Sequence, residues 1–478
     1  MDLIQILQAK FNKPSFRPGQ EETLRAALAG ENTLTIMPTG GGKSLIYQFL
    51  ASTLETGCVL VISPLVALID DQYEQAKALG LKVGKIHSAM PTQKRTEFWR
   101  HMADFRLILM TPERLLQEQA WEALSQTRVQ YLVIDEAHCL SQWGHDFRPD
   151  YTRIPEFHTK MGAPPVLALT ATATARVKTE IREVLGRTTT PKWFEYQAPV
   201  DRPNLNLNVY QAYGEADKLR RLSYWATNLE GPKIVYFSLV QTLERVSEQV
   251  QALGFSHTKY HGQLPSHIKL KNQKKFFSEE ESLILATPAF GLGVNKPNIR
   301  AVLHYEIPQS IEAYFQEVGR AGRDGLESWA EAFYDSDDVS IHMDFLKWNH
   351  PEPDFIYSLY QHIQDYPQRF VQEGADFLRE KLNFYNKRDY RVETTLNLLK
   401  RWDLLQVDTL GNVTTQNISE LRKIPDMDKA LHEKRKKSAQ LRLLDLVQLF
   451  EKYKSELDPP LGSVEMRKDI VDYFLERP

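Results

Sequence analysis

The sequence predicts an α/β fold, with two parallel-sheet domains followed by a mainly helical C-terminal region. Two stretches of the chain alternate short apolar runs with amphipathic segments of helix length, which is the pattern of a parallel sheet covered by helices. Beyond residue 340 the alternation stops and helical periodicity replaces it. We therefore expect domains at residues 1–200, 201–340 and 341–478.

The expected strands are short apolar runs bounded by turn residues. Those of the first domain are Leu34–Met37, Val59–Ser63, Leu107–Met110, Tyr131–Ile134 and Val166–Leu169. Those of the second domain are Ile234–Phe237, Leu283–Thr287 and Ala301–Tyr305, with Ala330–Tyr334 as an expected edge strand. The polar, proline-containing segment 198–204 separates the two sets and is expected to link the domains.

The composition is that of an ordinary globular protein, with 42% hydrophobic and 25% charged residues among 478. No apolar run reaches the roughly 18 residues that a membrane span needs, and the N-terminus lacks the pattern of a signal peptide. We therefore expect a cytoplasmic protein with no membrane partner. The net charge of −3 does not decide for or against nucleic acid, because local patches govern phosphate contacts. Two cysteines cannot form a four-thiolate zinc site, so no zinc is expected.

A glycine-rich loop and an acidic motif each follow an expected strand. Residues 37–44 read Met-Pro-Thr-Gly-Gly-Gly-Lys-Ser, and residues 135–138 read Asp-Glu-Ala-His. Backbone N–H groups of such a loop cradle phosphates, which assigns this role to Thr39, Gly40, Gly41 and Gly42. Lys43 is expected to reach the β- and γ-phosphates, while Ser44 and Asp135 hold Mg²⁺. Glu136 is expected to orient or deprotonate the attacking water. The pair of motifs predicts cleavage of a nucleoside triphosphate.

Two further segments add to this prediction. The amide of Gln20 offers one donor and one acceptor and suits an adenine edge; the alternative is a plain turn before a helix. Arg320 and Arg323 lie three positions apart on one helical face. An arginine there stabilises the charge that develops on a transferring phosphoryl group, and the alternative is a surface Arg–Asp network.

Aromatic and basic residues interleave directly after the Asp-Glu-Ala-His motif. The residues singled out are Gln142, Trp143, His145, Phe147 and Arg148. Aromatic side chains in a polar loop suit stacking on unpaired bases, and their nearness to the two carboxylates would let a bound base affect the triphosphate. The alternative is that Trp143 and Phe147 pack beneath the loop.

The C-terminal region carries two weaker signals. Residues 387–415 outline a helix, a strand, a turn and a second strand, which fits a winged helix and a generic helix with a hairpin equally. The basic run Lys434–Lys437 is expected to be either a solvated helix face or a phosphate contact.

The chain resembles the RecQ family of superfamily 2 DNA helicases, including its short bacterial, RecS-like form. The matching segments appear in the family's order over roughly residues 7–335. They are Phe16–Gln20, Met37–Ser44, Ser63–Gln72, Thr111–Leu115, Asp135–Tyr151, Ala168–Ala173, Tyr260–Gly262, Ala289–Pro297 and Gln316–Gly325. The loop after Asp-Glu-Ala-His is the element that separates this family from other superfamily 2 helicases.

The resemblance implies two RecA-like domains and ATP- and Mg²⁺-dependent unwinding of duplex DNA. It implies 3′-to-5′ translocation on single-stranded DNA, in recombination or repair, by a hydrolase and isomerase of the bacterial cytoplasm or nucleoid. By position it assigns base contacts with ATP to Arg17 and Gln20, coupling of DNA to hydrolysis to the loop after the acidic motif, and the arginine finger to Arg323. Lys13 stands where many members place an aromatic residue against adenine. The alternatives are a superfamily 2 RNA helicase and a non-catalytic DNA-binding protein of the same fold.

Many members of the family carry a four-cysteine zinc module after the second domain. Residues 441–447 and 466–474 resemble its helices, but Met466 stands where a cysteine ligand is expected. The resemblance therefore implies a metal-free helical remnant of this module.

Overall fold

The structure is a computed structural model that describes residues 2–38, 40–115, 117–141, 149–186, 192–291, 296–382, 390–401, 404–405, 426–456 and 463–476. The chain forms two compact units: Met1–Tyr334 together with Leu449–Pro478, and Asp335–Gln448. Among the described helices, none combines the length and the apolarity needed to cross a lipid bilayer.

The first unit contains two parallel sheets, which confirms the predicted fold class. The first sheet has the strand order β3-β4-β2-β5-β6-β1-β7. Its strands are β1 (Asn32–Ile36), β2 (Cys58–Ile62), β3 (Val83–Ile86), β4 (Leu107–Met110), β5 (Val129–Asp135), β6 (Val166–Thr170) and β7 (Trp193–Gln197). We call this sheet and its helices the first lobe.

The second sheet has the order β10-β11-β9-β12-β13-β8-β14 and is also parallel. Its strands are β8 (Leu205–Gln211), β9 (Lys233–Tyr236), β10 (Thr258–Tyr260), β11 (Leu283–Ala286), β12 (Ala301–His304), β13 (Ser328–Tyr334) and β14 (Lys454–Ser455). We call this sheet and its helices the second lobe. The prediction that residues 330–334 form an edge strand is wrong, because β13 pairs with β12 on one side and with β8 on the other.

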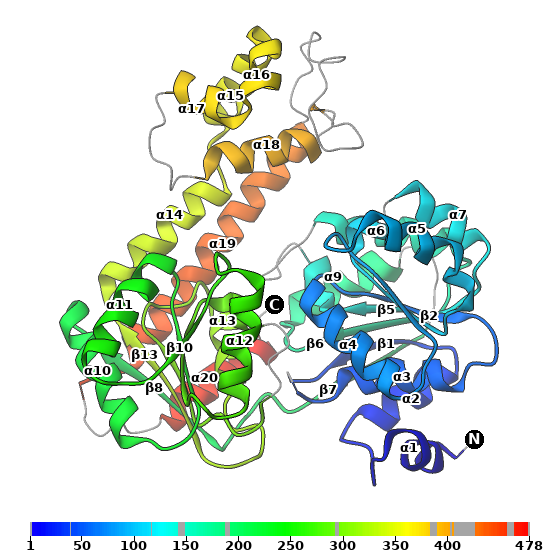
Figure 1. Cartoon of the computed structure of the whole chain (residues 1–478), viewed down its shortest axis with the longest axis horizontal. Coiled ribbons are helices and arrows are strands. Elements are labelled where there is room, and N and C mark those ends of the chain that lie inside the picture. Colours follow the sequence, from blue (N-terminus) through cyan, green and yellow to red (C-terminus); the bar gives the residue numbers. More distant parts are fainter. Residues whose placement is uncertain are drawn as a thin grey trace. The chain divides into compact units, whose positions relative to one another are not determined.

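Helices cover both faces of each sheet (Figure 1). Those of the first lobe are α1 (Leu3–Phe11), α2 (Gln20–Leu28), α3 (Lys43–Thr53), α4 (Val66–Ala78), α5 (Thr92–Arg100), α6 (Pro112–Leu115), α7 (Glu118–Ser125), α8 (Ile154–Lys160) and α9 (Ala175–Gly186). Those of the second lobe are α10 (Glu215–Asn228), α11 (Val240–Ala252), α12 (Ser266–Phe277) and α13 (Ile311–Val318).

Burial on both faces explains why the strands read as continuous apolar runs. In β2, Leu60 and Ile62 join the apolar cluster on one face, while Val59 and Val61 join the cluster on the other. All five residues of this strand are buried. A sheet of this kind brings the carboxyl ends of its strands to one edge, which is where α/β proteins bind ligands.

The second unit is helical. It contains α14 (Val339–Asn349), α15 (Pro353–Asp365), α16 (Pro367–Glu373), α17 (Ala375–Lys381), α18 (Arg391–Arg401) and most of α19 (Asp426–Tyr453). Ile356, Leu359 and Ile363 recur at helical spacing in α15 and belong to one apolar cluster with residues of α16, α17 and α18. Most of the predicted winged-helix-like segment lies outside the described residues; its described helix is α18.

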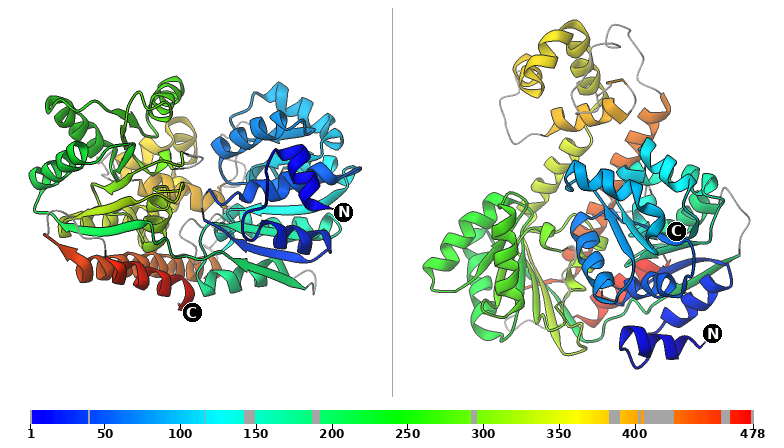
Figure 2. Two further views of the ribbon diagram at one scale, coloured as in Figure 1. Left: turned by 90° about the horizontal axis from the view of Figure 1, so that it is seen from below. Right: turned by 45° about the vertical axis from the view of Figure 1, so that its right-hand side comes forward.

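The end of the chain returns to the first unit. The C-terminal helix α20 (Val464–Glu476) runs beside the second sheet (Figure 2) and contacts β8. Met466, the residue in place of an expected cysteine, is fully buried in this helix. Across the described ranges, no group of three or more His, Cys, Asp or Glu side chains is arranged to hold a metal ion. The metal-free remnant of a zinc module stays a prediction.

A buried ion pair lies in the core of the second lobe. Arg221 of α10 and Glu331 of β13 are both fully buried, with Arg221 Nε 2.7 Å from Glu331 Oε2. Trp225 Nε1 donates to the same oxygen at 2.5 Å, and the amide of Asn208 donates to Glu331 Oε1. The carboxylate is therefore held by three side chains from two elements, β8 and α10.

Replacing Arg221 by alanine is expected to destabilise the protein by about 3–5 kcal/mol, because it leaves the Glu331 carboxylate buried without its counter-charge. Urea unfolding followed by tryptophan fluorescence measures this loss. The matched control is Arg220→Ala. The Arg220 side chain is 61% exposed beside Asp217, and its ion pair should contribute less than about 1 kcal/mol. Equal losses in the two variants would contradict the prediction.

Candidate active site

The glycine-rich loop leads from β1 into α3. Gly40 and Gly42 adopt φ values of 84° and 85°, a left-handed conformation that favours glycine. A methyl group at Gly42 would also lie 2.4 Å from the amide nitrogen of Gln20. Lys43 begins α3 and its Nζ donates to the backbone oxygen of Met37 at 3.0 Å. The loop thus closes around the N-terminus of an 11-residue helix, where free N–H groups favour an anion.

Gln20 and Arg17 hold this loop from α2 and the segment before it. Gln20 Nε2 donates to the backbone oxygen of Gly42 at 2.9 Å, and Gln20 Oε1 accepts from Arg17 N at 2.8 Å. The same amide nitrogen lies 3.5 Å from the oxygen of Gly41, and Arg17 Nη1 donates to the oxygen of Gly40. Arg17 and Gln20 therefore fix the glycine-rich loop through hydrogen bonds to its backbone. Their contact with adenine stays a prediction.

The two carboxylates of the acidic motif stand at the end of β5. Asp135 is 5% exposed, and burial together with the charge of Glu136 raises its pKa to about 7, against the opposing effect of Lys43. Glu136 has a φ of 49°, a conformation that is rare for a residue with a side chain and that recurs at active sites. Its backbone N–H donates to Asp135 Oδ1 at 3.0 Å. Within the described part of the chain, the buried Glu136 Oε2 has no hydrogen-bond partner; His138 Nδ1 lies 3.4 Å away.

Three side chains that the sequence did not single out contact the acidic motif: Thr170, Ser63 and Tyr151. The hydroxyl of Thr170, at the end of β6, lies 2.9 Å from Nδ1 of His138 in the motif. Ser63 Oγ lies 3.4 Å from Asp135 Oδ2, and Tyr151 donates to the backbone oxygen of Asp135 at 3.2 Å. Each belongs to a segment that resembles the family, but a contact partner cannot be read from a segment alone.

The two predicted arginines follow α13 in the second lobe. Arg320 is 3% exposed and donates through Nη1 to the backbone oxygen of Gly291. Arg323 Nε donates to the backbone oxygen of Gly319 at 3.3 Å. Burial, and then the charge of Arg320, lowers the pKa of Arg323 to about 9. A methyl group at Gly40 would lie 3.0 Å from Arg323 Cδ, so this arginine contacts the glycine-rich loop.

These residues line one cleft of ≈ 600 Å³ within the first unit. The predicted site residues that line it are Arg17, Gln20, Gly40, Gly42, Lys43, Ser44, Asp135, Glu136, Arg320 and Arg323. Phe11 and Lys13 also line it. Thr39 and residues 142–148, which include Gln142, Trp143, His145, Phe147 and Arg148, lie outside the described residues. The volume lies within the range of roughly 300–1,000 Å³ typical of cofactor sites.

The donor set fits a hard divalent cation beside a triphosphate. Ser44 and Asp135 offer oxygen ligands, which Mg²⁺ prefers, and both line the cleft next to Lys43. Burial and the charge of Glu136 raise the pKa of Asp135, and Glu136 Oε2 is buried without a hydrogen-bond partner among the described residues, which fits two carboxyl groups suited to a nearby cation.

Comparison with known proteins agrees with this geometry. Residues 17–181 match the DEAD/DEAH box helicase domain, and residues 215–325 match the helicase conserved C-terminal domain. A probable ATP-dependent DNA helicase RecS of Bacillus subtilis (strain 168) is 39% identical over 328 residues, which are 68% of this chain and 65% of the relative. The ATP-dependent DNA helicase RecQ of Haemophilus influenzae is 36% identical over 70% of this chain and 54% of the relative. The chain belongs to the RecQ family of helicases.

The match to these RecQ-family relatives thus spans roughly half to two thirds of their length. Solved structures show the same fold at lower identity. The helicase Lhr of Mycobacterium smegmatis, bound to ssDNA and AMP-PNP, has a TM-score of 0.58 at 18% identity, over 86% of this chain and 60% of that chain. Dbp5 of S. cerevisiae, bound to RNA and ADP BeF3, has a TM-score of 0.55 at 14% identity, over 72% of this chain and 90% of that chain. The RecQ-family chain therefore carries the two-lobed fold of superfamily 2 helicases.

Proposed function

We propose that this RecQ-family chain is an ATP- and Mg²⁺-dependent DNA helicase. It hydrolyses ATP in the cleft, translocates 3′ to 5′ on single-stranded DNA, and unwinds duplex DNA in recombination or repair. The observation that carries the proposal is the meeting of Lys43, Glu136 and Arg323 in one cleft, with the glycine-rich loop between them. Lysine, a carboxylate base and an arginine are the groups that phosphoryl transfer to water requires.

Each of these side chains has a separate chemical task. Lys43, at the start of α3, binds the β- and γ-phosphates, and Ser44 and Asp135 hold Mg²⁺. When bound, the magnesium ion neutralises part of the triphosphate charge. Glu136 orients the attacking water and accepts its proton, and Arg323 stabilises charge on the transferring group. Glu136 belongs to the first lobe, as the glycine-rich loop does, and Arg323 belongs to the second, so both lobes contribute to the site.

Coupling to DNA is assigned to the loop that contains residues 142–148. Its described flanks support this assignment, because each contacts the catalytic motif or a helix beside it. Tyr151 donates to the backbone oxygen of Asp135, and Ser141 donates to Glu180 of α9 at 2.6 Å. A DNA strand bound by this loop could therefore shift Asp135 through the contact between Tyr151 and the backbone of Asp135. The DNA is expected to be gripped through phosphates and stacked bases, so its sequence is not read.

The proposal predicts that the purified chain releases phosphate from ATP slowly, and at least ten times faster with single-stranded DNA. A colorimetric phosphate assay with DNA, with RNA and without either measures this. Lys43→Ala should abolish release in all three and keep DNA binding, because Lys43 is assigned to the triphosphate and not to DNA. A fork with a single 3′ tail should be unwound, and one with a single 5′ tail should not.

The other outcomes separate the alternatives. If RNA stimulates hydrolysis and DNA does not, the chain is an RNA helicase rather than a DNA helicase. A folded chain that binds DNA but releases no phosphate would be a non-catalytic binding protein, and the proposal would be wrong.

A further inference from the structure

The turn that carries Arg323 is tightly enclosed. Gly322 has a φ of 58° and its backbone N–H donates to the oxygen of Ile299 at 2.9 Å. A methyl group at this glycine would lie 2.5 Å from Asn204 Nδ2 and 2.7 Å from Ser328 Oγ. The turn therefore lies directly against the start of the second lobe, and its path is set by neighbours outside the turn.

Two side chains of the linker hold this turn. Arg202 Nη2 donates to the backbone oxygens of Ala321 and Gly322 at 3.1 and 2.9 Å. Asn204 Nδ2 donates to the oxygens of Gly322 and Leu326 at 2.8 and 3.0 Å. The two carbonyls that Arg202 binds are those between Arg320 and Arg323. One fixed guanidinium thus spans the part of the backbone that aims both arginines.

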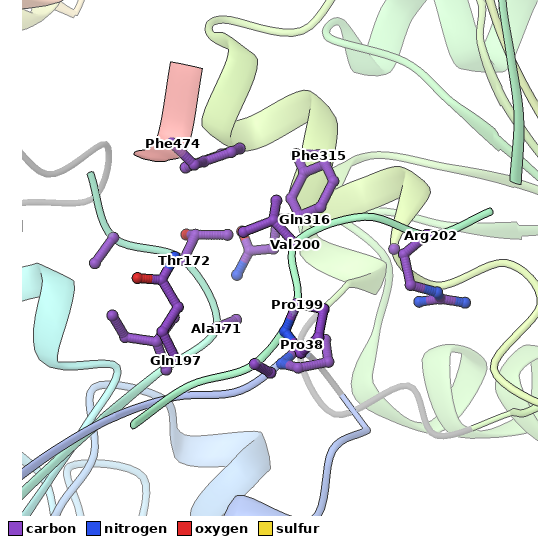
Figure 3. Close-up of a pocket in the computed structure, with 14 residues that line it drawn as sticks. Pro38, Ala171, Thr172, Gln197, Pro199, Val200, Arg202, Phe315, Gln316 and Phe474 are labelled. Carbon is purple, nitrogen blue, oxygen red and sulfur yellow. The ribbon is translucent and has the colours of Figure 1, made fainter. Parts of the chain in front are cut away.

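The linker is itself fixed from its other side. Arg467 of α20 pairs with Asp201 at 2.8 Å, and its Nη1 lies 3.4 and 3.3 Å from the oxygens of Pro203 and Leu205. The preceding residues, Pro199 and Val200, line an apolar pocket of ≈ 30 Å³ together with Phe315 and Phe474 (Figure 3). Arg202 thus extends from a backbone that is held by packing and by hydrogen bonds.

We propose that Arg202 is a positioning residue that aims Arg323 at the triphosphate through the backbone of Ala321 and Gly322. The proposal rests on the proposed function, in which Arg323 is the arginine finger. Displacing a catalytic group by about 1 Å lowers the rate by roughly 100-fold. Loss of Arg202 removes two of the hydrogen bonds that fix the carbonyls of Ala321 and Gly322, while the bonds from Asn204 keep the turn folded. Burial and, after it, the charges of Arg320 and Arg202 lower the pKa of Arg323.

The test is steady-state ATP hydrolysis with saturating single-stranded DNA. Arg202→Ala is expected to lower kcat by roughly 10- to 100-fold and to change KM for ATP by less than about threefold, since ground-state contacts are unaffected. Arg202→Lys keeps the positive charge and can donate to one of the two carbonyls, so it should recover part of the lost kcat. The matched control is Arg106→Ala, which removes another half-buried arginine that donates to a backbone oxygen, that of Glu55 at 2.9 Å, in the first lobe. This control should keep the kcat of the parent chain.

A double-mutant cycle with Arg323→Ala separates the possible failures. If Arg202 acts through Arg323, adding Arg202→Ala to Arg323→Ala causes no further loss of kcat. An additive loss, or a parent-like kcat in Arg202→Ala while Arg323→Ala is inactive, overturns the positioning role. A parent-like kcat in Arg323→Ala alone overturns the finger in the proposed function instead. If Arg202→Ala unfolds, Arg202→Gln in the same cycle gives the deciding measurement.

Discussion

Arg323→Ala is expected to lower kcat for ATP hydrolysis by about 10³-fold, at the lower end of the effect of an arginine finger. Arg323 contacts the glycine-rich loop at Gly40 but binds charge that develops only during transfer. The affinity for ATP should therefore change little. Equilibrium binding of nucleotide measures this affinity, and steady-state hydrolysis measures kcat.

Arg245→Ala is the matched control for this prediction. Arg245 is an exposed arginine of the second lobe that pairs with Glu215 at 2.8 Å, and its loss should leave kcat unchanged. If Arg323→Ala loses less than tenfold while Arg320→Ala loses 10³-fold, the finger is Arg320 and the assignment to Arg323 is wrong. Arg323→Lys should stay far below the parent rate, because an ammonium lacks the fork of donors.

Glu136→Gln is expected to lower kcat by about 10²- to 10⁴-fold, the range of a general base. The amide keeps the shape of the side chain but cannot accept a proton from water. The left-handed backbone at Glu136 supports a catalytic role over a structural one, as does its buried Oε2, which has no hydrogen-bond partner in the described ranges. Single-turnover hydrolysis at saturating ATP measures the chemical step directly.

ATP binding to the Glu136→Gln variant should remain, and DNA affinity in the presence of ATP should rise, since the ATP state persists. The matched control is Glu195→Gln on β7, where the carboxylate pairs with Lys178 and Arg182. Hydrolysis at the parent rate by Glu136→Gln would mean that the base is another group, and His138 would be the first to test.

The sequence was informative where chemistry depends on residue type at the end of a strand. The glycine-rich loop follows β1, and the two carboxylates stand at the end of β5, so the apolar runs before them indicated one edge of the first sheet. The sequence could not show that the arginines lie in the same cleft as the loop and the carboxylates, because Arg323 approaches Gly40 from the other lobe. The family resemblance, rather than the residue pattern, selected Arg323 over Arg320.

Five of the described strands, β3, β7, β8, β10 and β14, were missed from the sequence, and the loss of β8 explains why β13 was wrongly expected at a sheet edge. In β8, Asn206 and Asn208 alternate with apolar residues, and this polarity hid a strand that pairs with β13 on one side and with the two-residue β14 on the other. Asn208 is buried because it bonds to Glu331, a partner more than a hundred residues away. Arg202 was missed for a related reason: its partners are backbone oxygens 119 and 120 residues later, which carry no signature in side-chain type.

Because residues 449–478 belong to the same unit as residues 1–334, a shortened protein that retains both lobes must keep the end of the chain. Stopping near residue 340 would strip β14 from β8, leaving an open sheet edge, and would uncover Tyr314 where Phe450 packs on it. Tyr334 Oη donates to Glu451 at 2.6 Å, so the two crossing points of the chain into the helical unit lie close together. Excising residues 335–448 and closing the gap with a short glycine-serine bridge is expected to keep both lobes folded, whereas truncation near residue 340 is expected to promote aggregation through the open edge of β8.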